Sequence, residues 1–330
     1  MENRLMGKIL KNRTLTLGFI LVILLLPFFV HSQYVLHVLV LIGLYVTLAQ
    51  SLNVVVGYNG QFSLGHAGFW AIGAYVSALL MLRLGASFWV ASMAAACFSF
   101  LVGVLLGLPA MRLKGDYLCI VTLGFGEIVR LVLTNSDTAR GPMGLPGIPS
   151  PTLFGKVLDT EAAMYYLSWV IAGLTIFFVA RMLNGRLGRA VMAVRDDEVA
   201  ATSLGINPTY YKVIAFGIGG FFAGLAGAFY ASWTSFISPD VFQFTDSANI
   251  FCMIILGGLG SLVGPVIGAF LLAGLPEVLR GFAEFRLIFL GVLMVLFMVY
   301  RPGGIVGSYE ATQGTRKKSG FMQRFFPKRS

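Results

Sequence analysis

The feature that most constrains this chain is a series of long apolar runs along almost its whole length. A helix needs roughly 20 mostly apolar residues to cross the hydrocarbon core of a bilayer, which is about 30 Å thick. Runs near that length occur at about 14–31, 35–56, 62–82, 88–111, 117–134, 163–183, 213–232, 246–275 and 286–300. They are continuously apolar and lack the alternation of barrel strands. The sequence therefore predicts an all-α, multi-pass transmembrane helical bundle of about nine to ten spans.

Composition supports this class of fold. Of the 330 residues, 57% are hydrophobic and 12% are charged, and the mean hydropathy of +0.84 is far above that of soluble domains. Basic residues precede the first run, as they do in a signal peptide, but residues 28–33 lack a small-x-small cleavage site. We therefore expect the first run to stay attached.

The net charge of +10 comes mainly from the two ends of the chain and from the loops. Residues 301–330 carry seven Lys and Arg side chains and only one acidic residue, Glu310. We interpret this tail as an anchor against anionic membrane lipid and expect no nucleic-acid partner. The predicted organisation is a basic cytoplasmic N-terminus at 1–13, a transmembrane domain at 14–300 and a basic cytoplasmic tail at 301–330.

The positive-inside rule predicts the orientation of the spans. With a cytoplasmic N-terminus, the polar loop at 184–212 is cytoplasmic and the loop at 135–162 lies outside. A single crossing at 246–275 would then place the basic tail outside as well. The glycines and the proline at 257–265 provide a break, so we expect two short or re-entrant helices that line the pathway. Both termini are then cytoplasmic.

A related glycine-rich string occurs early in the chain. Residues 60–75 and 260–270 both carry Ser-Leu near Gly, followed by Ile-Gly-Ala and an aromatic residue. Two such segments indicate an internal inverted repeat with the solute route at its interface; the alternative is that both are small-residue helix-packing motifs. The candidate path residues in these strings are Gln61, Ser63, His66, Gly257, Gly258 and Gly260. The polar ones either line the path or satisfy backbone groups that the break frees.

The loop at 184–212 is the most polar internal stretch. Residues 196–198 are acidic and suit the N-terminal end of a short helix, which Gly205 can end in a left-handed conformation. Asn207 then caps the next helix, with Pro208 as its first residue. Such a short helix needs packing from neighbours or from a partner protein. By spacing alone, it is equally an ordinary connecting loop or a docking element.

This loop resembles the cytoplasmic coupling loop of ABC importer permeases, whose pattern is Glu-Ala-Ala, three residues and Gly. Ala200, Ala201 and Gly205 match that spacing, whereas Glu198 lies one position too early, with Val199 between. The resemblance implies that a short helix at 197–204 couples the membrane helices to the ATPases. The residues it assigns to this coupling are Arg195, Asp196, Asp197, Glu198, Ala200, Ala201, Gly205 and Asn207.

Other strings extend the resemblance over residues 40–305: those at 60–69, 113–117, 122–130 and 256–261. Together they resemble the LivM-type permeases of branched-chain (leucine, isoleucine, valine) amino acid ABC importers. The resemblance implies alternating access in a bacterial inner membrane, a second related permease subunit, two cytoplasmic ABC ATPase subunits and an extracytoplasmic solute-binding protein. The chain has no Gly-x-x-x-x-Gly-Lys-Ser/Thr phosphate loop. We therefore expect it to bind no cofactor, with ATP used by the partner subunits.

Glu127 and Arg130 are the charged pair within an apolar run. They are three residues apart and can share one helix face. Either they lie beside the route and meet the ammonium and carboxylate of a zwitterionic solute, or they form a structural ion pair near the outer face.

Two other classes of protein fit the residues less well. An ion-gradient-driven secondary transporter would need a membrane-embedded titratable cluster beyond Glu127. An intramembrane enzyme would need a metal motif or paired carboxylates. The three histidines form no such motif, and the three cysteines lie in apolar runs without metal-ligand spacing. Within the importer class, urea or short amides are the alternative solutes.

Overall fold

The computed structural model describes residues 32–110, 115–153 and 155–278, with short pieces at 26–27, 113, 291–292, 295, 300 and 303–306. Six helices in this part are long and apolar enough to cross a membrane. They are α3 (Gln33–Asn53) with its extension η1 (Val54–Tyr58), α4 (His66–Leu84), α5 (Phe88–Ala110), α6 (Asp116–Thr134), α7 (Glu161–Asn184) and α10 (Pro208–Thr234). The extension η1 is a π-helix.

Shorter elements connect or follow these helices. The short α-helices are α8 (Arg186–Asp196), α9 (Glu198–Ser203), α11 (Phe244–Gly257) and α12 (Gly264–Val278). The single-turn 3₁₀ helices are η2 (Asp137–Ala139), η3 (Gly141–Met143) and η4 (Pro239–Val241). Two-residue strands pair as β1 (Leu145–Pro146) with β4 (Phe236–Ile237), and as β2 (Thr152–Leu153) with β3 (Lys156–Val157). The predicted all-α class is therefore confirmed.

The helices coincide with the apolar runs predicted between about 35 and 275. The expected break in the run at 246–275 is confirmed, because α11 ends at Gly257 and α12 begins at Gly264. The predicted spans at 14–31 and 286–300, and the tail at 301–330, lie outside the described residues apart from a few positions. The total number of spans therefore stays a prediction.

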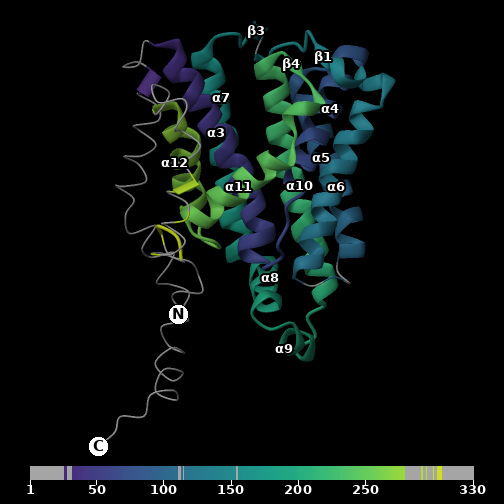
Figure 1. Ribbon diagram of the computed structural model, residues 1–330, viewed down its shortest axis with the longest axis vertical. Helices are drawn as coiled ribbons and strands as arrows, with labels where there is room; N and C mark the ends of the chain where they lie inside the picture. The colour runs from purple at the N-terminus through teal and green to yellow at the C-terminus, as the bar shows by residue number, and fades with distance from the viewer. Residues whose placement is uncertain are drawn as a thin grey trace, which may run out of the picture.

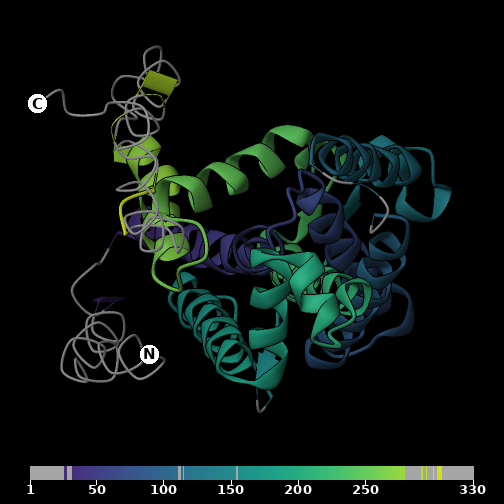
Figure 2. The same ribbon diagram turned by 90° about the horizontal axis from the view of Figure 1, so that it is seen from below.

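The bundle has two sides, which are joined by packing of α10 on α3 and by oblique α11 (Figures 1 and 2). Helix α10 packs with α4 and α5 on one side, with α6 against α4. On the other side α3 packs with α7 and α12, and α11 contacts both α12 and α3. Helices α8 and α9 lie at one end of the bundle, and strands β1 and β4 lie at the opposite end (Figure 1).

Close helix contacts in the bundle are made by glycine. A Cβ atom at Gly73 of α4 would collide with the backbone of Gly224 of α10, and one at Gly268 of α12 would collide with the Met253 carbonyl of α11. Small residues allow such close backbone approach in membranes, where apolar lipid provides no hydrophobic drive for association. Gly73 and Gly268 belong to the two related strings, so the helix-packing interpretation holds at these positions. The inverted repeat stays a prediction.

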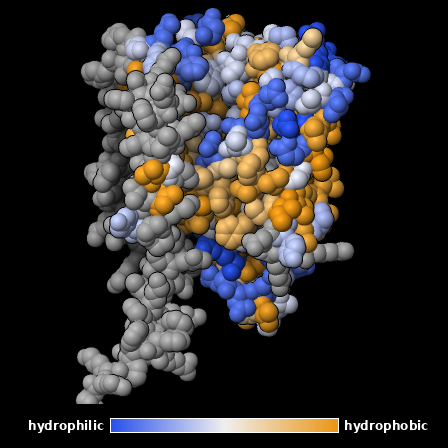
Figure 3. Space-filling view, viewed as in Figure 1, coloured by the Kyte–Doolittle hydropathy of each residue, from blue (hydrophilic) through white to orange (hydrophobic). Residues whose placement is uncertain are grey.

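The surface is that of a membrane protein. In Figure 3 hydrophobic residues form a band at mid-height, with polar residues above and below it. The large apolar side chains that are exposed on the molecule include Leu101, Leu105, Ile128, Val132 and Phe177. Burial differs among the helices: 78% of the apolar window of α3 is buried, compared with 11% for α6. Helix α3 therefore belongs to the core, and α6 lies at the periphery.

Candidate functional site

The predicted short helix is present as α9, and Asp197 caps its N-terminus. The Asp197 carboxylate accepts hydrogen bonds from the backbone N–H groups of Val199 (2.9 Å) and Ala200 (3.0 Å). Glu198 is the first residue of the helix. Asp196 differs from the expectation, because it is the last residue of α8 and not part of the cap. A side-chain oxygen at the N-cap satisfies amide groups that have no partner within the helix.

Gly205 ends α9 in the left-handed conformation, as expected, with φ of +79°. The N–H of Ile206 donates to the Ala201 carbonyl (3.0 Å), and the N–H of Gly205 donates to the Thr202 carbonyl (2.9 Å). These two bonds make a Schellman motif, which needs a residue with positive φ at this position. The start of α10 is confirmed as well, because the Asn207 side chain accepts from the N–H of Tyr210 at 3.3 Å and Pro208 is the first helical residue.

An ion pair holds α9 against α10. Lys212 Nζ lies 2.7 Å from Glu198 Oε2, and the Lys212 side chain is only 13% exposed. Val199 in the first turn of α9 and the C-cap residue Leu204 are 78% and 80% exposed, whereas Ala201 is buried. Helix α9 is therefore attached to the bundle and leaves an apolar side chain exposed at each of its ends. Such exposed apolar side chains can contact a partner protein.

Sequence reasoning missed the helix α8 that precedes α9. Its buried residues Gly188, Val191 and Val194 recur at spacings of three residues, and this periodicity is the signal that could have revealed an amphipathic helix. Helix α8 packs against α7, α10 and η1. Its last turn brings the partly buried Arg195 to the end of η1, where the Arg195 guanidinium donates to the carbonyl of Gly57.

Arg195 and Asn53 join the π-helix to the break between α11 and α12. Asn53 Nδ2 donates to the Ser261 carbonyl (2.8 Å), and the N–H of Gly260 donates to Asn53 Oδ1 (3.0 Å). We call Asn53, Gly57, Arg195, Gly260 and Ser261 the Arg195 junction. It brings the predicted path residue Gly260 together with Arg195, which was predicted to couple to the ATPases. Sequence analysis assigned no role to Asn53, because nothing near it in the sequence indicates that it reaches Gly260 and Ser261.

The glycines of the break adopt conformations that side chains rarely tolerate. Gly258 has φ of +121° and Gly260 has φ of +71°. A Cβ atom at Gly257 would collide with the carbonyl of Gly264. The break is therefore a tight glycine-dependent turn, and it lies at the same end of the bundle as α8 and α9, because Arg195 of α8 contacts it.

The polar residues of the glycine-rich string at 60–75 are buried, and they contact different neighbours. Asn59 donates to Gln61 Oε1 within the turn that follows η1. His66 Nε2 lies 2.6 Å from Ser51 Oγ, at 1% exposure. Ser63 is also 1% exposed. These contacts show that Gln61 and His66 satisfy neighbouring groups in this conformation. Whether Gln61, Ser63 and His66 meet a solute stays a prediction.

The expected pairing of Glu127 and Arg130 is present. Arg130 Nε lies 2.9 Å from Glu127 Oε2, and Arg130 Nη1 lies 3.9 Å from Asp240 Oδ1 of η4. The Arg130 and Glu127 side chains are 27% and 33% exposed. The pair thus joins α6 to the 235–243 loop. Its contact with a solute stays a prediction.

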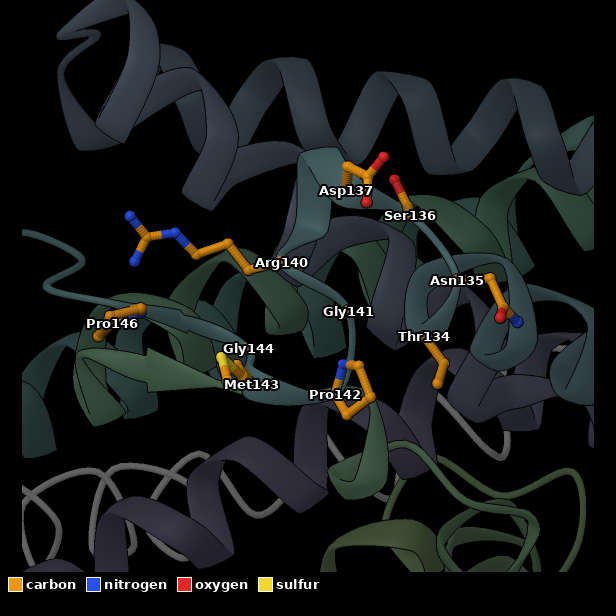
Figure 4. Close-up of a pocket in the computed structure, with 10 residues that line it drawn as sticks. All are labelled: Thr134, Asn135, Ser136, Asp137, Arg140, Gly141, Pro142, Met143, Gly144 and Pro146. Atoms are coloured by element: carbon orange, nitrogen blue, oxygen red, sulfur yellow. The ribbon is translucent and has the colours of Figure 1, made fainter.

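The opposite end of the bundle is closed by the 135–162 loop. Strand β1 of this loop pairs with β4, and the N–H of Gly147 donates to the Ser235 carbonyl at 3.0 Å. A pocket of about 700 Å³ opens within the loop (Figure 4). Its lining residues are Thr134, Asn135, Ser136, Asp137, Arg140, Gly141, Pro142, Met143, Gly144 and Pro146. Among the described residues, no cluster of His, Cys, Asp or Glu could hold a metal ion.

Similarity to known proteins extends over most of the chain. The family model for the branched-chain amino acid transport system permease component matches residues 34–298. The high-affinity branched-chain amino acid transport system permease protein LivM of Salmonella typhimurium is 39% identical over 324 residues, with 91% of this chain and 76% of that protein covered. LivM of Escherichia coli matches at the same identity and coverage.

A second kind of permease is more distantly similar. The permease protein LivH of Salmonella typhimurium is 26% identical over 288 residues, with 81% of this chain and 92% of LivH covered. No solved structure matches the chain.

Proposed function

The chain belongs to the permease component family of branched-chain amino acid transport systems, and we propose that it is the LivM-type subunit through which a bacterial ABC importer carries leucine, isoleucine and valine. The observation that carries the proposal is the agreement between the family match over residues 34–298 and the capped helix α9 at the end of the bundle. As a subunit for transport, the chain has no ATPase role of its own.

We propose that α9 is the element on which the partner ATPases act. Its exposed Val199 and Leu204 offer an apolar contact, and the Glu198–Lys212 ion pair links its movement to α10. Two cytoplasmic ABC ATPase subunits would contact this end, which is then the cytoplasmic end. Their ATP-driven closure would move α9, and the membrane helices would rearrange around a central path by alternating access.

The other partners in the proposal are a related permease subunit and an extracytoplasmic solute-binding protein. Similarity to LivH, a permease protein of the high-affinity branched-chain amino acid transport system of Salmonella typhimurium, supports a heterodimer of two permeases. The binding protein would dock at the end that carries the 135–162 loop. With α9 in the cytoplasm, the orientation agrees with the positive-inside rule, and the basic termini face anionic lipid of the inner membrane.

The solute is tested by uptake into cells that lack this subunit. Radiolabelled leucine, isoleucine, valine and urea are supplied with and without the restored chain, its ATPases and its binding protein. We expect the restored chain to rescue the three amino acids only. Rescue of urea alone would overturn the solute, and uptake that persists after ATP depletion would favour a secondary transporter and overturn the ABC mechanism.

The coupling role of α9 is tested by Gly205→Pro and by Asp197→Lys. Both changes damage an end of α9, because Gly205 has positive φ and the Asp197 carboxylate caps the helix. We expect membrane insertion to persist while ATP hydrolysis no longer drives uptake. Arg181→Glu is the matched charge-reversal control, since Arg181 is exposed in the last turn of α7 and has no role in the proposed coupling. Normal uptake in the α9 variants would overturn the coupling assignment.

A further inference from the structure

Arg195 connects three segments that are distant in the sequence. Its guanidinium donates to the Gly57 carbonyl in the π-helix, 138 residues away. A Cβ atom at Gly60 would lie 3.0 Å from Arg195 Cγ, and one at Gly260 would lie 3.0 Å from Arg195 Nη1. The side chain thus passes between two glycines, one in each of the two related strings. Because Gly60 and Gly260 have no side chains, there is space beside them for the Arg195 side chain.

The segments that meet at Arg195 are irregular. A π-helix places carbonyl groups out of the usual helical register, and such bulges are frequent at functional sites. Gly258 and Gly260 interrupt the next helix pair with positive φ. Non-helical backbone at membrane depth persists only where protein groups or a water-filled cavity satisfy it. Here Arg195 satisfies the Gly57 carbonyl, and Asn53 satisfies Gly260 and Ser261.

The location of these contacts relates them to α9. Arg195 lies in the last turn of α8, two residues before Asp197, the N-cap of α9. A displacement of α9 is therefore passed to Arg195 through a two-residue connection. Gly57 and Gly260 contact each other directly, and the Arg195 side chain lies against both of them. Its withdrawal would remove the charged hydrogen bond that holds this contact between η1 and the break. The cationic group also faces the C-terminal end of η1, where helical carbonyls favour positive charge.

We infer that Arg195 is a positioning residue that latches η1 to the break between α11 and α12, and that movement of α9 releases it, with Asn53 as the second member of the latch. The inference rests on the proposed function, because that function identifies α9 as the element the ATPases move. It assigns Arg195 an intramolecular task and does not place its side chain in the ATPase contact.

The test uses the complete importer in proteoliposomes, with Arg195→Gln and Arg195→Lys variants of this subunit. Glutamine keeps a hydrogen-bond donor but removes the charge, and lysine keeps the charge but loses the planar fork. Arg189→Gln is the matched control, because Arg189 is exposed on the same helix and donates to the nearby Asn184 carbonyl (3.0 Å). Measured quantities are uptake, ATP hydrolysis and co-purification of the ATPase subunits.

A second readout reports on the junction itself. Leu262, in the break, packs against the buried cluster that contains Tyr58 and Val191. Leu262→Cys, in a chain whose native cysteines are replaced by alanine, is labelled with a membrane-impermeant maleimide. A released latch exposes this position, so the labelling rate measures opening of the junction without depending on transport.

We expect Arg195→Gln to retain the ATPase subunits at the wild-type level, to transport about tenfold less solute per ATP and to label at position 262 about tenfold faster, as loss of one charge-assisted hydrogen bond would produce. Lysine should be intermediate, and the Arg189 control should match the wild type. Wild-type coupling and labelling in Arg195→Gln would overturn the latch. ATP-independent uptake by the unmodified importer would instead overturn the proposed function.

Discussion

Helices α10 and α4 approach closely at glycine without polar side chains at the point of contact, whereas the Arg195 junction adds hydrogen bonds from Asn53 and Arg195 to the close approach of Gly57 and Gly260. At the first contact, Gly73 lies directly against the backbone of Gly224. At the second, Asn53 and Arg195 reach across to carbonyl and amide groups of other segments. Dense backbone contact has no alternative arrangement of similar energy, while hydrogen bonds between membrane helices contribute only about 0.6–2 kcal/mol each. We therefore expect the α10–α4 contact to be rigid and the Arg195 junction to be able to open.

The largest effect is expected where the rigid contact is forced apart. Gly73→Val places side-chain atoms where the Gly224 backbone lies, so we expect a loss of about 3 kcal/mol or more, at or beyond the upper end for overpacked cores. The measurement is thermal stability of the detergent-purified protein. Gly173→Val on α7 is the matched control, because a Cβ atom there meets nothing within 4 Å. Equal stability of the two variants would show that the α10–α4 contact is not rigid.

A smaller loss is expected at the junction. Asn53→Leu leaves the N–H of Gly260 and the carbonyl of Ser261 without their partner, at a cost of about 1–3 kcal/mol. We expect the variant to fold and to lose coupled uptake, which thermal stability and solute uptake measure together. Asn184→Leu is a control, since Asn184 is exposed and its side chain donates to the Ala180 carbonyl in its own helix. An unfolded Asn53 variant would mean that the junction is a rigid core contact.

The ion pair between Glu198 and Lys212 gives a third test, at the boundary of the moving element. Glu198→Lys places like charges together, and adding Lys212→Glu restores a pair of opposite charges at the same two positions. We expect a coupling energy of about 1 kcal/mol, because the pair is partly exposed. A double-mutant cycle in thermal stability, followed by uptake, measures it. Additive effects would show that α9 is not held to α10 through this pair.

The smallest effect is expected outside both regions. Glu127→Gln weakens the ion pair with Arg130, but Arg130 keeps Asp240 at 3.9 Å. Since partly exposed pairs contribute little, we expect a change within about 0.5 kcal/mol. The solute concentration for half-maximal uptake should then stay the same. A large increase in that concentration, with unchanged stability, would indicate that the pair meets the solute's charged groups.

The local elements of the coupling segment could be predicted from the sequence because they follow from short-range rules. Gly205, Asn207 and Pro208 each occupy the predicted position, since caps and turns depend on neighbouring residues alone. The sequence did not single out which of the three acids at 196–198 caps α9, because any of them can accept hydrogen bonds at an N-cap. Which acid is chosen depends on where α8 ends, and α8 is stabilised by packing against α7, α10 and η1.

The sequence by itself determined the membrane class, the apolar helices between residues 33 and 278, the break near Gly258 and the C-terminal end of α9, because bilayer thickness and local backbone preferences act on contiguous residues. Only the tertiary structure decided that Asn53 and Arg195 meet Gly57 and Gly260. Those contacts join residues up to 207 positions apart. No periodicity or motif specifies them, because they depend on how independently formed helices pack in three dimensions.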